Sequence, residues 1–295
     1  MNIAYFDCFS GISGDMSLAA LVDAGADREY IERELGKLQI EPFQLEWVKV
    51  IKCGVSALKL NVIEDKETPP AHHRHYSEIV KFIKEAQFSP RVTDYSLKIF
   101  EQIAIAEGKI HNLPVEKVHF HEVGAIDSIV DVVGVALALD SLNIDEIISA
   151  PVPLGYGKIR CDHGIYPVPA PATLEMMKGI PLADSKLNME MTTPTGAGII
   201  SGLASSFSPG VPRMTVRAIG YGAGTKDLPS QPNVLRVIIG EAEELPLAVN
   251  NKHEHGHGHA HHEHEHGHGH GHSHHHDHEH GHTHAHHHEH EHDGK

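Results

Sequence analysis

The chain has 295 residues, 30 of them histidine, and its 24 basic and 40 acidic side chains give a formal net charge of −16. Residues 1–251 alone carry −10, which disfavours nucleic acid and anionic membranes as partners. No apolar run approaches the ~20 residues of a membrane span, and the N-terminus lacks the features of a signal peptide. Cys8, Cys53 and Cys161 are far apart and form no CxxC pair, as expected in a reducing cytoplasm. The sequence therefore predicts an acidic cytoplasmic protein.

In the first half of the chain, short apolar runs alternate with segments of helical periodicity. Residues 3–8 are typical of a buried strand, and Asp15 can cap the helix that follows. Residues 64–74, with two adjacent prolines, predict a break. We expect strands at 3–8 and 43–63, the latter divided around Gly54, and helices at 15–23, 28–38, 76–86 and 91–108.

The second half keeps the same alternation. A short strand at 117–121 leads into a strongly apolar helix at 125–142, and glycine and proline predict turns and short strands at 155–171. The remaining elements are expected as strands at 147–151, 213–220 and 234–240 and as helices at 173–178 and 196–206. Strands alternating with helices favour an α/β body, with a mixed sheet and flanking helices.

Histidine is concentrated at the C-terminal end, where 23 of the 30 lie between His253 and His292. The other residues there are mostly Gly, Glu, Asp and Ala, which cannot build an apolar core, so we expect a disordered tail. The predicted organisation is an α/β body at 1–245, which could divide near 64–75, followed by the tail at 246–295.

The histidine tract predicts metal binding. Neutral imidazole is the commonest protein ligand for Ni, Zn, Cu and Co, and the alternation His-Glu-His-Gly-His lets several rings reach one ion. A flexible imidazole site follows the intrinsic affinity order, so the tract predicts a divalent metal without selectivity. The alternative is a tail that only solubilises the chain. Candidate tail ligands are His255, His257, His259, His261, His274, His275, His276, His286, His287 and His288.

A second candidate site spans residues 118–131, Val-His-Phe-His-Glu-Val-Gly-Ala-Ile-Asp-Ser-Ile-Val-Asp. In a strand, His119 and His121 project from one face because side chains alternate. Asp127 and Asp131 lie on one face of the following helix, among apolar neighbours, where an unpartnered charge is costly. A metal or a pair of cations would resolve that cost. The alternative is that Asp127 complements the helix dipole and Asp131 faces water.

The opening segment Asp7-Cys-Phe-Ser-Gly-Ile-Ser-Gly-Asp15 joins the first predicted strand to the first predicted helix. It could present backbone N–H groups to an anion or place Asp7 and Asp15 around a cation. It lacks the lysine of a P-loop and the third glycine of a dinucleotide fingerprint. The alternative is a tight turn with Asp15 as the N-cap.

Two further segments carry polar groups suited to ligands. The loop Ala71-His-His-Arg-His-Tyr76 places His72, His73 and His75 beside an arginine, which suits a metal or a phosphate, although exposed polar loops are common. Residues 189–197, Met-Glu-Met-Thr-Thr-Pro-Thr-Gly-Ala, offer hydroxyls just before a helix, either as caps or for an anion.

Several of these segments, in this order, closely resemble the LarC family over residues 1 to about 240. The matching motifs are Phe6-Asp-Cys-Phe-Ser-Gly-Ile-Ser-Gly-Asp-Met16, His-His-Arg-His at 72–75, His119-Phe-His-Glu-Val-Gly-Ala-Ile-Asp-Ser128, Pro167-Val-Pro-Ala-Pro-Ala172 and Thr192-Thr-Pro-Thr-Gly-Ala197. Members of this family often carry a His-rich insert where the tail lies.

The resemblance implies a nickel chelatase that acts on pyridinium-3,5-bisthiocarboxylic acid mononucleotide and forms the nickel-pincer cofactor of lactate racemase while consuming CTP. Full-length members continue into a portion that binds CTP with a divalent cation such as Mg or Mn. The resemblance covers only the N-terminal part, so we expect a C-terminal companion polypeptide to supply that step. Apo-lactate racemase or a related enzyme is the expected recipient.

These inferences lead to a working hypothesis in which the tail concentrates Ni(II) and the body transfers it. The expected transfer ligands are His119, His121 and Glu122, with His72, His73 and His75 as a second cluster. The carboxylates Asp7, Asp15, Asp127 and Asp131 would hold a catalytic cation or act as a base. The rival hypotheses are a non-catalytic nickel storage or delivery protein and, less favoured, a metal-dependent phosphohydrolase built on the Asp7–Asp15 loop.

Overall fold

The computed structural model describes residues 1–65, 74–120, 123–161 and 164–242. Its main sheet is mixed and has seven strands in the order β11-β6-β1-β13-β12-β3-β2. Those strands are β1 Asn2–Asp7, β2 Phe43–Lys52, β3 Val55–Glu64, β6 Glu146–Ser149, β11 Ser206–Phe207, β12 Met214–Ala223 and β13 Val234–Ala242. Strand β1 pairs with β6 in parallel and with β13 antiparallel, so the predicted α/β class with a mixed sheet is confirmed.

Short two-stranded ladders lie outside the main sheet, and two of them join segments that are well separated in the chain. They pair β4 Arg74–His75 with β5 His119–Phe120, β7 Val152–Pro153 with β10 Leu182–Ala183, and β8 Gly157–Cys161 with β9 Gly164–Val168. The first of these ladders joins two segments that the sequence analysis treated separately.

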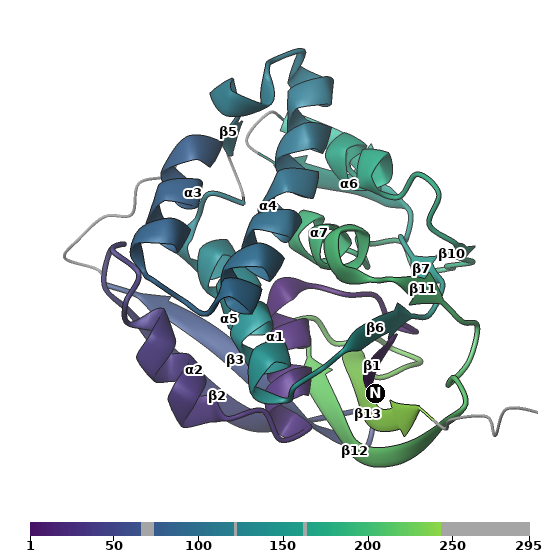
Figure 1. The fold of residues 1–295 in the computed structure, drawn as a ribbon. Coiled ribbons are helices and arrows are strands. Elements are labelled where there is room, and N and C mark those ends of the chain that lie inside the picture. Colours follow the sequence, from purple (N-terminus) through teal and green to yellow (C-terminus); the bar gives the residue numbers. More distant parts are fainter. Residues whose placement is uncertain (66–73, 121–122, 162–163, 243–295) are drawn as a thin grey trace, which may run out of the picture. The chain divides into compact units, whose positions relative to one another are not determined.

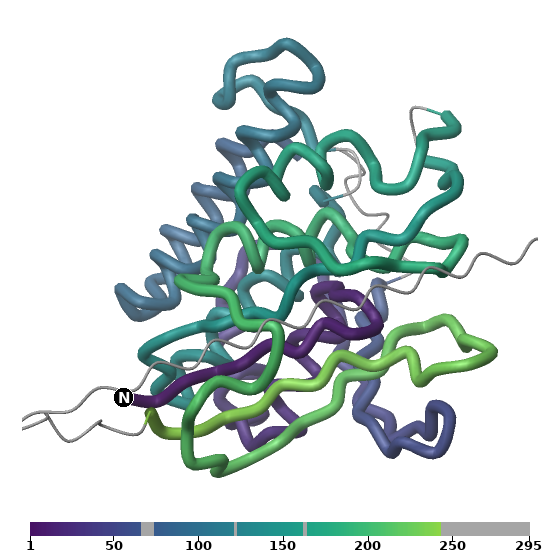
Figure 2. The backbone as a smooth tube through the Cα atoms, turned by 90° about the vertical axis from the view of Figure 1, so that its right-hand side faces the viewer, coloured from purple at the N-terminus to yellow at the C-terminus, as the bar shows by residue number. Residues whose placement is uncertain are grey.

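Helices gather over one face of the main sheet (Figures 1 and 2). They are α1 Gly14–Asp23, α2 Arg28–Leu35, α3 Tyr76–Glu85, α4 Pro90–His111, α5 Ile126–Ser141, α6 Pro171–Met176 and α7 Pro194–Leu203, with a 3₁₀ turn at Val115–Lys117. Their apolar side chains share one core with sheet residues such as Phe6, Leu58 and Val237. Helix α5 is buried on nearly every side, which explains why its sequence is apolar all round.

Helix α1 lies unusually close to strand β12. A Cβ atom at Gly220 would stand 2.0 Å from the backbone oxygen of Ala20, and one at Gly222 would stand 1.9 Å from that of Met16. Only glycine fits such contacts with a helix backbone. These two residues therefore set the position of α1, whose first turn enters the site described below.

Most predicted elements are present, and the differences lie at their ends. The N-cap of α1 is Ser13 and not Asp15 as the sequence predicted; Asp15 lies inside the first turn, where its negative charge interacts favourably with the helix dipole. The expected strand at 117–121 starts at His119, because residues 115–117 form the 3₁₀ turn, and residue 121 lies outside the described residues.

Contacts within the chain divide it into Met1–Pro246 and Leu247–Lys295. The second unit, and with it the tail and its candidate ligands, lies outside the described residues, so the predicted domain boundaries stay predictions. Within the described ranges, no helix combines the length and apolarity needed to cross a bilayer.

Candidate active site

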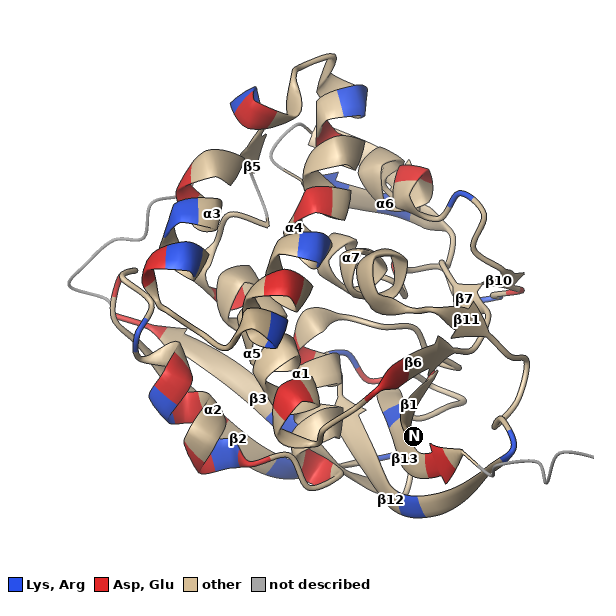
Figure 3. Ribbon diagram, viewed as in Figure 1, with Lys and Arg blue, Asp and Glu red and all other residues tan. Residues whose placement is uncertain are grey.

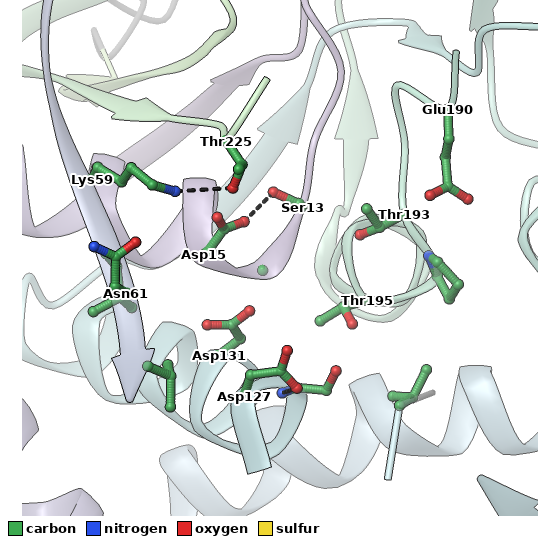
Figure 4. Close-up of a pocket in the computed structure, with 16 residues that line it drawn as sticks. Ser13, Asp15, Lys59, Asn61, Asp127, Asp131, Glu190, Thr193, Thr195 and Thr225 are labelled. Atoms are coloured by element: carbon green, nitrogen blue, oxygen red, sulfur yellow. Dashed lines mark hydrogen bonds between the residues drawn. The ribbon is translucent and has the colours of Figure 1, made fainter. Parts of the chain in front are cut away.

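A cavity of about 430 Å³ lies where the N-terminal turns of three helices approach strand β3 (Figure 4). Helices α1, α5 and α7 each contribute the residues of their first turn. The polar side chains that line the cavity are Ser13, Asp15, Lys59, Asn61, Asp127, Ser128, Asp131, Glu190, Thr193, Thr195 and Thr225. This polar lining makes the cavity the best candidate for a functional site in the described part of the chain.

Two of the three helices enter the cavity without a side-chain cap. The side chains of Ser13 and Ala125, the N-caps of α1 and α5, accept no hydrogen bond from a backbone N–H of their helices, and the Ser13 hydroxyl donates to the Asp15 carboxylate instead. Instead, Asp15 and Asp127 lie in the first turns, where a negative charge is favourable next to the helix dipole. Helix α7 differs, because the Thr193 hydroxyl accepts a hydrogen bond from the Gly196 N–H at 3.2 Å.

Asp131 is the buried carboxylate of the site. It lies one turn after Asp127 on α5, is only 8% exposed, and its Oδ1 has no hydrogen-bond partner in the described structure. Burial raises its pKa well above the ordinary value, and the nearby charges of Asp15 and Asp127 raise it further. The backbone N–H of Asp15 and the charge of Lys59 lower this pKa in part.

The burial of Asp131 tests one part of the alternative interpretation made from the sequence. The alternative in which Asp131 simply faces water is wrong, because the packing of α5 against α1 removes the side chain from solvent. Figure 3 shows that most of α5 is uncharged and that α7 beside it carries no charged residue.

Gly14 makes room for this arrangement. A Cβ atom at this position would stand 2.5 Å from both Cβ and Oδ2 of Asp131 and 2.8 Å from Cγ2 of Thr195. The first turn of α1 can therefore approach α5 and α7 only with glycine here. The last glycine of the Gly-Ile-Ser-Gly sequence in the opening segment is therefore required for the packing of α1 against α5 and α7.

Strand β3 provides the one basic side chain among the described lining residues. Lys59 Nζ donates a hydrogen bond to Thr225 Oγ1 at 3.0 Å, as Figure 4 shows. The sequence analysis missed both residues. Lys59 alternates with the apolar Leu58 and Leu60, a pattern that predicts a solvent-facing side chain, and no local signal brings residue 225 to it.

Asp7 lies apart from this cavity. It ends strand β1, and its Oδ2 accepts a hydrogen bond from Arg236 Nε at 2.9 Å on the neighbouring strand β13. It does not line the cavity that contains Asp15. The structure thus gives Asp7 an arginine partner, and its catalytic role stays a prediction.

The two predicted histidine clusters meet at the β4–β5 ladder. His75 and His119 face each other in the register, and their ring centroids are 3.6 Å apart at an interplanar angle of 46°. His75 is fixed at the start of α3, where its N–H donates to Glu78 Oε2 at 2.8 Å. The remaining members of these clusters, His72, His73, His121 and Glu122, lie outside the described residues.

Arg74 connects this histidine pair to the entrance of α5. It is 4% exposed, donates to the Gly124 carbonyl at 2.6 Å and forms an ion pair with Glu41. A buried arginine with these partners is not free to bind phosphate, which was one interpretation of the His-His-Arg-His loop. Its role is to hold the turn before α5 in place.

Among the residues that the structure describes, no group of three His, Cys, Asp or Glu side chains is arranged to hold a metal ion. The carboxylates of the cavity are therefore not a ready-made cation site. The unpartnered, buried carboxyl of Asp131 suits proton transfer better, and the His75–His119 pair offers two imidazoles that a metal could share with further ligands.

The fold and the cavity thus define an α/β protein with a carboxylate-lined pocket and a separate pair of facing histidines. The nickel insertion protein family matches residues 4–268, and the chain belongs to this family. The resemblance to LarC noted in the sequence is thereby confirmed.

Curated relatives support the same assignment. The chain is 56% identical over 248 residues to the pyridinium-3,5-bisthiocarboxylic acid mononucleotide nickel insertion protein of Geobacillus kaustophilus, covering 82% of this chain and 60% of the relative. It is 52% identical over 239 residues to the protein of that name from Staphylococcus epidermidis, covering 81% of this chain and 59% of the relative. A putative nickel insertion protein of a Geobacter species is 48% identical over 244 residues, covering 83% of this chain and 63% of the relative. The chain thus spans about 60% of the length of these relatives. No solved structure matches it.

Proposed function

We propose that this chain belongs to a nickel chelatase that inserts Ni(II) into pyridinium-3,5-bisthiocarboxylic acid mononucleotide, giving the nickel-pincer cofactor of lactate racemase. The observation that carries the proposal is the 56% identity over 248 residues to a relative named for insertion into this mononucleotide. The family match over residues 4–268 contains all residues that line the carboxylate-lined pocket.

The carboxylates supply the proton chemistry in this proposal. The ring carbon between the two thiocarboxylates loses its proton, and the electron pair left on carbon forms the bond to nickel. Asp131 accepts that proton, because a raised pKa makes its ionised form a stronger base and the unpartnered Oδ1 is free to bind the proton. Asp15 and Asp127 stabilise the positively charged pyridinium ring. Asp7 is bound to Arg236 outside the pocket, so of the four predicted carboxylates it is assigned no direct contact with the substrate.

The histidines supply the nickel in this proposal. Neutral imidazoles of the tail, residues 246–295, concentrate Ni(II) and release it to the body, residues 1–245. His75 and His119, whose rings already face each other, receive the ion together with His72, His73, His121 and Glu122.

Other components complete the reaction. A C-terminal companion portion would bind CTP with Mg or Mn, and apo-lactate racemase or a related enzyme would receive the finished cofactor. In this proposal, nickel binding, insertion and transfer of the cofactor all take place in the cytoplasm.

A nickel storage or delivery protein without a catalytic step is the second candidate, and the 23 histidines between His253 and His292 are the observation that favours it. Removing residues 247–295 separates the two. With free nickel in excess and the companion portion and CTP supplied, we expect the shortened chain to metallate the mononucleotide at a rate close to that of the full chain. Mass spectrometry of the product measures this rate. Loss of metallation despite excess nickel would favour the carrier.

A further inference from the structure

The mechanism proposed above uses the carboxylates of the pocket and leaves its lysine without a role. We propose that Lys59 and Thr225 form a subsite for the phosphate group of the mononucleotide substrate. This inference rests on the proposed function and adds to it the orientation of the substrate in the pocket.

The free hydrogen-bonding capacity of the pair suits a phosphate. Lys59 Nζ uses one of its three hydrogens on Thr225 Oγ1, so two remain for phosphate oxygens. Thr225 accepts that bond, which leaves its own hydroxyl hydrogen to donate. Among the described residues, no carboxylate lies within the 4.0 Å ion-pair distance of Lys59 Nζ, so its charge is not already neutralised by a direct partner.

The loop that carries Thr225 is held independently of Lys59. Lys52, only 9% exposed, donates to the carbonyls of Thr225 and Lys226, both at 3.4 Å, and to Asp227 Oδ1 at 2.6 Å. Asn233 Nδ2 also donates to the Lys226 carbonyl, at 2.9 Å. The Thr225 hydroxyl is therefore preorganised, and the phosphate does not have to order this loop on binding.

The charges of the pocket match one orientation of a pyridinium mononucleotide. Such a molecule carries a positive ring at one end and a phosphate at the other. Figure 4 shows Lys59 and Thr225 pointing toward each other with Asp15, which accepts a hydrogen bond from the Ser13 hydroxyl, drawn beside them, and Asp127 and Asp131 on the opposite side of the cavity. Phosphate at Lys59 places the ring toward the carboxylates, whereas the reverse orientation would bring phosphate against Asp127 and Asp131. A cavity of about 430 Å³ is within the range of small-molecule sites.

A purely electrostatic role for Lys59 gives a different expectation. Lys59 lowers the pKa of Asp131, so its loss would change the metallation rate even if no phosphate ever touched it. Such a role would affect substrates with and without phosphate equally. Dependence on the phosphate group is therefore the readout that identifies the subsite.

The test uses the full chain and two compounds: the mononucleotide substrate and the nucleoside obtained by removing its phosphate enzymatically. Affinity is measured by calorimetry and nickel insertion by mass spectrometry. We expect wild type to bind the mononucleotide about 10- to 100-fold more tightly than the nucleoside, as for loss of one charge-assisted hydrogen-bonded contact. Lys59→Met should remove most of that difference and leave nucleoside affinity unchanged, and Lys59→Arg should restore it.

Lys81→Met is the matched control, because Lys81 is a 67% exposed lysine of α3 that does not line the pocket. The inference is overturned if Lys59→Met binds the two compounds in the wild-type ratio or if wild type does not distinguish them. Equal insertion into both compounds would refute the phosphate subsite and leave the proposed function standing. Absence of insertion into either compound would refute the proposed function itself.

Discussion

At the scale of single residues, Asp131 is the buried carboxylate of the pocket. Its Oδ1 is buried without a partner in the described structure, while the Asp15 N–H supports the ionised carboxylate. The sequence could show that Asp127 and Asp131 share a helix face among apolar residues, because that follows from the spacing alone. Burial of Asp131 could not be predicted, since it depends on Gly14 of a distant helix approaching within contact distance.

The raised pKa of Asp131 predicts a pH-dependent cost in stability. A carboxyl whose pKa is higher in the folded than in the unfolded state stabilises the fold fully below its ordinary pKa of 3.8, and this contribution is lost as pH rises through the raised value. Asp131→Asn mimics the protonated form at every pH. We expect its melting temperature to exceed that of wild type increasingly from pH 4 to pH 8, as measured by thermal denaturation.

Asp94→Asn is the control for this measurement, because Asp94 is 53% exposed and pairs with Lys98 on the surface of α4. Its melting curve should follow that of wild type across the same range. Parallel melting temperatures for Asp131→Asn and wild type at all pH values would show that the carboxyl is not destabilised by burial.

The facing histidines make a separate prediction at the same scale. His119→Ala removes one of two imidazoles whose ring centroids are 3.6 Å apart. We expect the rate of nickel insertion at limiting nickel to fall by about tenfold or more, the lower range for loss of a group that supports metal binding. Nickel bound by the tail, measured by equilibrium dialysis, should not change. His111→Ala, at the end of α4, is the control. Insertion by His119→Ala at the wild-type rate would exclude this pair as a transfer site.

At the scale of the elements, the site depends on how closely helices approach the sheet and one another. The sequence indicated α1 and α5 correctly because apolar runs, glycines and acidic first turns are local signals. It could not indicate the two-residue β4–β5 ladder, which joins residues more than 40 positions apart and is too short for a periodic pattern. Register between such segments is decided by packing alone, and so the meeting of His75 and His119 was not foreseen.

Gly222 tests the importance of the close contact between α1 and β12. In Gly222→Ala the new Cβ would lie 1.9 Å from the backbone oxygen of Met16, so α1 must move. We expect the free energy of unfolding to fall by about 1–3 kcal/mol. Insertion activity should fall as well, because α1 carries Asp15. Urea unfolding measures the change in stability.

Gly210→Ala is the matched substitution, because nothing lies within 4 Å of the new Cβ atom. Its stability should stay within about 0.5 kcal/mol of wild type. If both variants unfold at the same urea concentration, the helix is not held by this contact.

At the scale of the whole molecule, the histidine-rich composition and the carboxylate-lined pocket belong to different parts of the sequence. Composition predicted a metal-binding tail from residue types alone, whereas the pocket draws on β3, α1, α5, α7 and the loop at Thr225, which no sequence window contains. That is why Lys59 was missed although the acidic motifs were recognised. The described body carries the pocket and the histidine pair, and the division of chemistry to the body and nickel supply to the tail stays part of the proposed function.

The most direct test of the account compares the rate of nickel insertion into the mononucleotide between wild type and Asp131→Asn. Both full chains are assayed with excess Ni(II) and with the companion portion and CTP present. Product is followed by mass as the nickel-containing species. We expect wild type to form it and Asp131→Asn to be at least about 100-fold slower, the lower range for removal of a general base, while still binding the substrate. Insertion by Asp131→Asn at the wild-type rate would contradict the assignment of this pocket as the insertion site.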